Sequence, residues 1–121
     1  QTITALYEIV PTVFQTDEPI PYATFDCRYK EQLGLSSKQL SLDVYYENSK
    51  SENLTFAAGV AAYGMLLRNS EYKGTANLEM VKQLIGSSLN YDPKGYRQGL
   101  LDLLNHLSSE QVSELNNRAA K

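Results

Sequence analysis

The residue type best suited to catalysis occurs once in this chain, as His106, with acidic residues nearby at Asp102 and Glu110. Asp102 and His106 are four residues apart in an expected helix, so their side chains can touch on one helical face. A hydrolase-type enzyme that uses His106 is therefore one hypothesis for the function. Because the sequence pattern places no nucleophile or metal ligand beside His106, a solvent-facing histidine in a surface pair is the simpler interpretation. We expect no catalytic residue in this chain.

Patterns for other kinds of chemistry are missing from the sequence. The acidic residues stand mostly singly, no group of Cys and His has metal-ligand spacing, and Gly59 and Gly64 fall inside an expected helix instead of a phosphate-binding loop. The single cysteine, Cys27, cannot form an internal disulfide and lies on the apolar side of an expected strand, where small buried thiols are common. We predict that the chain is not an enzyme and binds no metal and no cofactor.

Charge and hydropathy narrow the range of partners. The 11 basic and 14 acidic residues are interspersed and give a net charge of -3, so we expect no surface for nucleic acid. No apolar stretch approaches the roughly 20 residues of a transmembrane helix, so we expect the chain not to span a membrane. The chain begins at Gln1 and becomes strand-like almost at once, from which we expect neighbouring sequence in a larger protein.

Tyrosine dominates the aromatic composition, with nine tyrosines and no tryptophan. Tyrosine rings often anchor protein interfaces, although strands favour them as well. The interface candidates are residues at outward or loop positions, namely Tyr45, Tyr72, Lys73, Tyr91 and Tyr96. Asn53, Leu54 and Thr55 match the pattern for N-glycosylation, but we expect them to cap a helix instead.

The first 50 residues follow the two-residue period of β-strands. Strands are expected over residues 2–10, 24–30 and 40–47, and the last two are expected to pair as an antiparallel hairpin. The proline-rich stretch 11–21 is expected to be an exposed connection. Since three strands leave edges unpaired, we expect upstream strands to complete the sheet. The apolar face of the hairpin, which should pack inside a sandwich or against helices, comprises Phe25, Cys27, Tyr29, Leu40, Leu42 and Val44.

After residue 50 the apolar period changes to that of helices. A first helix is expected over residues 54–69 and a second over residues 77–90, with Asn77 as its N-cap. Asp92 and Pro93 are expected to provide the cap and the first turn of a third helix.

A short fourth helix is expected after Ser108, which fits a capping pattern with Gln111. It should extend through Leu115 and fray over residues 116–121. The expected helical core comprises Phe56, Val60, Leu67, Val81, Leu84, Ile85, Leu100, Leu104 and Leu107.

Together these patterns predict an α+β fold, in which a partial antiparallel sheet of about three strands, or half of a sandwich, precedes a three-helix unit. Residues 1–50 are expected to be the β-rich part and residues 51–121 the helical part of one structural unit. The segment 63–97 also has features of a tetratricopeptide repeat, which makes a helical protein-docking module an alternative function. Only one such segment occurs, whereas repeat folds need several stacked copies.

Three stretches of the sequence occur in a specific combination. They are residues 2–11 (TITALYEIVP), residues 28–30 (RYK) and residues 56–74, which contain FAA and YGMLLRNSEYKG. The later Gly95-Tyr96-Arg97 and its leucine-rich helix also fit. In this combination the chain resembles the C-terminal domain of bacterial von Willebrand factor A (VWA) domain-containing proteins, an uncharacterised domain family.

The resemblance implies an upstream VWA domain that binds a divalent cation through an Asp-x-Ser-x-Ser motif, which this chain does not contain. It implies that the chain itself is a non-catalytic accessory or structural domain, supporting ligand or protein binding at the bacterial envelope, outside the cytoplasm. The implied partners are the upstream VWA domain of the same chain and another envelope protein.

Overall fold

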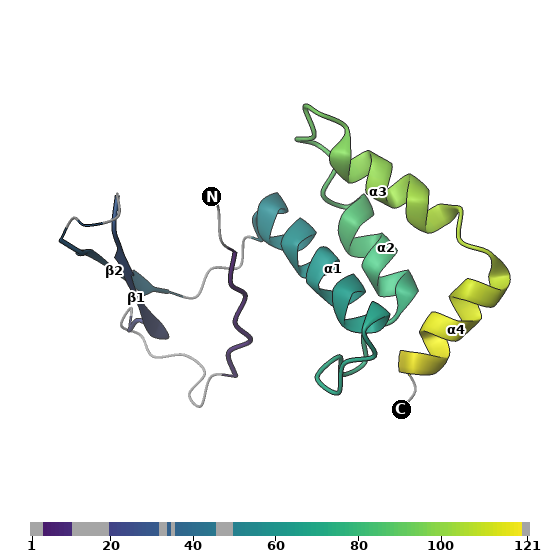
Figure 1. The fold of residues 1–121 in the computed structure, drawn as a ribbon, viewed down its shortest axis with the longest axis horizontal. Helices are drawn as coiled ribbons and strands as arrows, with labels where there is room; N and C mark the ends of the chain where they lie inside the picture. Colours follow the sequence, from purple (N-terminus) through teal and green to yellow (C-terminus); the bar gives the residue numbers. More distant parts are fainter. Residues whose placement is uncertain (1–3, 11–19, 32–33, 35, 46–49, 120–121) are drawn as a thin grey trace. The chain divides into compact units, whose positions relative to one another are not determined.

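The structure of the chain is a computed structural model that describes residues 4–10, 20–31, 34, 36–45 and 50–119. In these residues the predicted α+β class is confirmed, as a two-stranded antiparallel sheet followed by four helices (Figure 1). The chain divides into two compact units, residues 1–49 and residues 50–121. None of the helices described is long and apolar enough to cross a membrane. The elements are β1 (Ala23–Tyr29), β2 (Lys38–Val44), α1 (Glu52–Leu67), α2 (Leu78–Gly86), α3 (Tyr96–Asn105) and α4 (Ser109–Ala119).

β1 and β2 form the predicted antiparallel hairpin. Phe25 pairs with Leu42, so the apolar side chains of the two strands share one face. On the other face Thr24 lies opposite Asp43, and its hydroxyl donates a hydrogen bond of 2.9 Å to the Asp43 carboxylate. The alternation of apolar and polar residues specifies this register, because a slip by one residue would turn the apolar side chains to the opposite face.

The strand predicted over residues 2–10 is wrong for the part that the structure describes. Residues 4–10 have no regular secondary structure, and their side chains are exposed. A strand needs partners for its backbone N–H and C=O groups, and within the described residues β1 and β2 pair only with each other. Most of the predicted 11–21 connection and the last two residues of the 40–47 strand lie outside the described residues.

Side-chain caps determine where the first two helices begin. Asn77 caps α2 as predicted, because its side-chain oxygen accepts a hydrogen bond of 2.9 Å from the Met80 N–H. The cap predicted at Asn53 is wrong, since the Ser51 hydroxyl accepts from the Leu54 N–H at 3.1 Å and starts α1 earlier. α2 is also shorter than predicted, because it ends at Gly86 instead of near residue 90.

The start predicted for the third helix is wrong by three residues. Asp92 and Pro93 lie in a tight turn, closed by a hydrogen bond of 3.0 Å from the Gly95 N–H to the Asp92 carbonyl, and α3 begins only at Tyr96. Gly95 has a φ of 68°, a left-handed conformation that glycine adopts without strain. The chain therefore turns sharply into α3, and Asp92 lies in the loop before this helix instead of at its N-cap.

The predicted fourth helix is present, and its capping pattern is confirmed. The Gln111 N–H donates to the Ser108 hydroxyl at 3.2 Å, and the Ser108 N–H donates to the Gln111 side chain at 2.8 Å. The helix continues to Ala119, so the fraying predicted from residue 116 is wrong for the residues described. The described part of residues 50–121 therefore forms four helices, whereas a three-helix unit with a short fourth helix was predicted.

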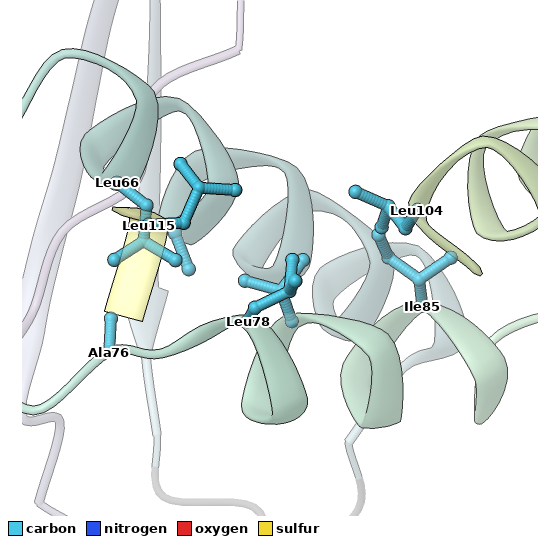
Figure 2. Close-up of a cluster of buried hydrophobic side chains, with 8 residues drawn as sticks. Leu66, Ala76, Leu78, Ile85, Leu104 and Leu115 are labelled. Atoms are coloured by element: carbon cyan, nitrogen blue, oxygen red, sulfur yellow. The ribbon is translucent and has the colours of Figure 1, made fainter. Parts of the chain in front are cut away.

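The helical unit encloses an apolar core to which all four helices contribute. Val81, Ile85 and Leu104 were predicted to be core residues, and all three are fully buried. Gly59 lets α1 and α2 approach closely, since a Cβ at this position would lie 3.0 Å from Ile85 Cγ1. The buried apolar cluster comprises Ala62, Leu66, Ala76, Leu78, Val81, Ile85, Leu104 and Leu115 (Figure 2).

The buried side of α1 differs from the predicted one. Val60 and Leu67, predicted for the core, are 42% and 49% exposed, whereas Ala62 and Leu66 are buried. Since α1 is apolar on all sides, the spacing of its apolar residues does not determine which side faces inward. The contact with α2 at Gly59 determines it instead.

Candidate functional site

His106, the residue of the enzyme hypothesis, lies at the C-cap of α3 and is exposed to solvent. Its ring Nδ1 lies 2.6 Å from the main-chain oxygen of Asp102. The Asp102 carboxylate instead accepts a hydrogen bond of 2.7 Å from the Gln98 side chain. Glu110 is exposed in the first turn of α4. The ring of His106 thus contacts the backbone at the C-terminal end of α3.

No cluster of potential metal ligands forms among the described residues, where no three His, Cys, Asp or Glu side chains converge. Cys27 is a free, partly buried thiol in β1.

Three of the predicted interface residues are presented to solvent by the helical unit. Tyr72 lies in the α1–α2 connection, Tyr91 lies in the α2–α3 connection, and Tyr96 is the first residue of α3; all three are 70–81% exposed. Tyr45 is also exposed, but it belongs to the first unit. Tyr91 and Tyr96 therefore lie in and directly after one connection, and the other candidates lie elsewhere.

The fifth candidate, Lys73, is only 8% exposed. Its ammonium donates a hydrogen bond of 2.9 Å to the side chain of Asn69, which follows the C-cap of α1 and has a left-handed conformation with a φ of 50°. A surface hollow of about 420 Å³ lies at this turn, lined by Asn69, Glu71, Lys73 and Gly74. Because the lining carries one acid and one base, the hollow favours no particular class of charged ligand. Lys73 has a local role in holding the turn.

Arg97 holds the α2–α3 connection against α1. Its guanidinium donates hydrogen bonds of 2.7 Å to the Ser88 carbonyl and 2.5 Å to the Asn53 side chain, and it lies 4.8 Å from the centre of the Phe56 ring. No pattern in the sequence predicts this role of Arg97. Its partners are 9 and 44 residues away along the chain, so no local spacing marks them. The connection that carries the exposed tyrosines is therefore anchored at a defined position.

Asp92 fixes the other side of this connection. Its carboxylate accepts a hydrogen bond of 2.9 Å from the Gln98 N–H. This bond, together with weaker ones from the Arg97 and Tyr96 N–H groups and the charge of Arg97, lowers the pKa of Asp92 below its usual value of 3.8, although burial acts in the opposite direction. The loop is therefore held most firmly when this carboxylate is ionised.

The first unit presents an apolar surface that its own described residues leave uncovered. We name it the hairpin face, and its residues are Phe25, Cys27, Tyr29, Leu40, Leu42 and Val44. Apart from the partly buried Cys27, these side chains are 38–60% exposed. A two-stranded hairpin is only marginally stable in water, and an exposed apolar patch usually marks an interaction site.

Comparison with known proteins gives a family match over most of the chain. A family model described as "Uncharacterized protein YfbK, C-terminal" matches residues 1–109. A curated relative, the uncharacterized protein YfbK of Escherichia coli strain K12, is 40% identical over 57 residues. These residues are 47% of this chain but only 10% of the relative. No solved structure gives a significant match.

Proposed function

The chain belongs to the family of YfbK C-terminal domains, and from this premise we propose that it is a non-catalytic structural domain of a larger protein. In this proposal the hairpin face packs against the part of the polypeptide that precedes it. The resemblance to the C-terminal domains of bacterial VWA proteins suggests that this preceding part contains a VWA domain. Ligand binding at the bacterial envelope would then belong to the VWA domain, and the present chain would support it.

The observation that carries the proposal is the exposure of the hairpin face. Leu40 and Leu42 are 55% and 60% exposed although they lie in the middle of a strand pair. Burying a leucine or phenylalanine fully contributes about 1.5–3 kcal/mol, so covering the exposed half of Phe25, Leu40 or Leu42 contributes about 1 kcal/mol each. A covering layer from the same polypeptide would stabilise the hairpin by about 3 kcal/mol in total.

The lack of catalytic function in this proposal is supported by the surroundings of His106. Its ring contacts a backbone oxygen, and the nearby Asp102 carboxylate is bound by Gln98. General acid–base catalysis needs a histidine that is oriented toward a substrate by a partner of its own. The contacts of His106 are those of a helix terminus.

Cysteine labelling tests the proposal. In a Cys27→Ser background, Leu42→Cys reports on the hairpin face, and Ser41→Cys, the adjacent residue on the opposite face of β2, is the matched control. In a polypeptide that includes the preceding part, we expect maleimide to react with position 42 much more slowly than in the 121-residue chain. Position 41 should react similarly in both. Equal reactivity of position 42 in the two polypeptides would exclude a covering layer on the hairpin face.

Protein docking by the helical unit is a second candidate function. It is favoured by one observation, the exposure of Tyr91 and Tyr96 on a connection that Arg97 anchors, because a pre-ordered aromatic surface loses little entropy on binding. If envelope extract contains such a partner, the 121-residue chain should capture it and the double variant Tyr91→Ser/Tyr96→Ser should not. Equal capture by both would exclude these tyrosines as the docking residues.

A further inference from the structure

Lys73 is the one charged residue that is buried among the residues that the structure describes. It is 8% exposed, and the other buried polar residue, Ser88, is neutral. A lysine is rarely buried without an anionic partner, because removing its ammonium from water is costly. The ammonium of Lys73 instead donates to a neutral group, the side-chain oxygen of Asn69, at 2.9 Å. No carboxylate in the described part of the chain pairs with this ammonium.

Hydrogen-bond donors remain unused around this lysine in the α1–α2 connection (Figure 1). An ammonium has three N–H donors, and the contact with Asn69 uses one of them. The main-chain N–H groups of Glu71 and Gly74 also have no hydrogen-bond partner among the described residues. All these residues line the surface hollow of about 420 Å³. The lining therefore has donors available for a carboxylate from outside the chain.

Glu71 brings the opposite charge to the same hollow. It is exposed, and within the described ranges it forms no ion pair with Lys73. A purely anionic ligand would meet this carboxylate, and a purely cationic ligand would meet the Lys73 ammonium. A ligand with both charges can pair each of them with its opposite. A lining of one acid and one base is therefore complementary to a zwitterion.

We propose that this hollow binds the zwitterionic head group of a free α-amino acid. The ligand carboxylate accepts hydrogen bonds from the Lys73 ammonium and from a main-chain N–H of the lining, and the ligand ammonium pairs with the Glu71 carboxylate. The bond from Lys73 to Asn69 remains in the complex, because two further N–H donors of the ammonium are available. The site is independent of the hairpin face and would add small-molecule binding to a structural domain.

Titration of the 121-residue chain with glycine, followed in ¹H–¹⁵N NMR spectra, tests the proposal. Glycine carries both charges, whereas acetate carries only the anion and methylammonium only the cation. We expect saturable shifts of the Glu71, Lys73 and Gly74 amide signals with glycine, with a Kd on the order of 1 mM because the ligand is small. At equal ionic strength, acetate and methylammonium should each bind about tenfold more weakly, because each lacks one of the two ion pairs.

Variants of the two charged residues test each ion pair separately. Glu71→Gln changes an exposed side chain, so it should leave the fold intact and weaken glycine binding about tenfold. Lys73→Met keeps an unbranched buried side chain and should abolish the saturable shifts. Glu79→Gln and Lys82→Met, both in α2, are the matched controls and should bind glycine as the original chain does.

Three results would overturn the proposal. The first is the absence of saturable shifts at glycine concentrations up to about fifty times the expected Kd. The second is acetate binding as tight as that of glycine, which would make the hollow an anion site. The third is equal glycine binding by Glu71→Gln and its control Glu79→Gln, which would show that the Glu71 carboxylate does not contact the ligand.

Discussion

Gly59 and Gly64 of α1 should respond differently to the same substitution, and the difference tests how α1 packs. Gly59→Ala places a Cβ 3.0 Å from Ile85 Cγ1 and 3.2 Å from Leu84 Cβ, whereas Gly64→Ala places a Cβ with no heavy atom within 4 Å. Each replacement gains about 1 kcal/mol of helix propensity. Only Gly59→Ala must also displace packed side chains, which costs about 1–3 kcal/mol.

We therefore expect Gly64→Ala to stabilise the 121-residue chain by about 0.5–1 kcal/mol, and Gly59→Ala to change its free energy of unfolding between no effect and a loss of about 2 kcal/mol. Urea unfolding followed by the helical circular dichroism signal measures both variants under the same conditions. Gly59→Val, with a larger β-branched side chain, should lose more than Gly59→Ala. If Gly59→Ala stabilised the chain as much as Gly64→Ala does, the close contact between α1 and α2 would be refuted.

Three further predictions concern the core and the α2–α3 connection. Leu104→Ala removes a fully buried side chain and should lower the free energy of unfolding by about 2–5 kcal/mol, whereas Leu103→Ala, at a neighbouring exposed position, should change it by less than about 0.5 kcal/mol in the same urea titration. Arg97→Met leaves the Ser88 carbonyl without its charged donor and should cost about 1.5–3 kcal/mol, with faster amide exchange in the 88–95 segment. Because the folded-state pKa of Asp92 is lowered below 3.8, the stability that its carboxylate contributes is present above pH 3.8 and is lost as the pH falls through the folded-state pKa. Asp92→Asn should remove this part of the acid dependence in unfolding measurements between about pH 2 and 6.

Each of these predictions has an outcome that contradicts it. Equal losses for the two leucine variants would mean that α3 packs through a different side. An Arg97→Met variant with unchanged stability and unchanged exchange would show that the connection is held by other contacts. An Asp92→Asn variant with the same acid profile as the original chain would mean that the carboxylate is no more favourable in the folded chain than in the unfolded chain.

The hairpin and α2 could be predicted from the sequence because each carries a strong local pattern. Alternation of apolar and polar residues determined the pairing of Phe25 with Leu42. In α2 a cap residue, Asn77, is followed by apolar residues at helical spacing, two of which, Val81 and Ile85, are buried as expected.

α1 and the start of α3 could not be predicted in the same way. α1 has no polar side to mark which of its faces is exposed, so Val60 and Leu67 were assigned to the wrong side of the helix. At α3 the Asp92 side chain bonds an N–H six residues ahead, across a turn made by Gly95, and such a bond cannot be told from a regular N-cap by residue type alone.

The interface candidates were chosen because their positions in the sequence were expected to be exposed, and the sequence indicates exposure only indirectly. Tyr72, Tyr91 and Tyr96 are exposed, but Lys73 is buried and donates a hydrogen bond to Asn69. The contacts of Arg97 span the fold and leave no local signature. The hairpin face was predicted from its alternation, whereas its exposure in this chain became visible only in the structure.

Amide hydrogen exchange in the hairpin is the most direct test of the central claim that this chain is a structural domain packed on the preceding part of its polypeptide. Covering Phe25, Leu40 and Leu42 should stabilise β1 and β2 by about 3 kcal/mol, which corresponds to a roughly hundredfold slower exchange. We therefore predict that amides of the β1–β2 pairing exchange about 100 times more slowly in a polypeptide that includes the preceding part than in the 121-residue chain. Equal exchange rates in the two polypeptides would contradict the claim, because the hairpin face would then remain uncovered in the larger protein.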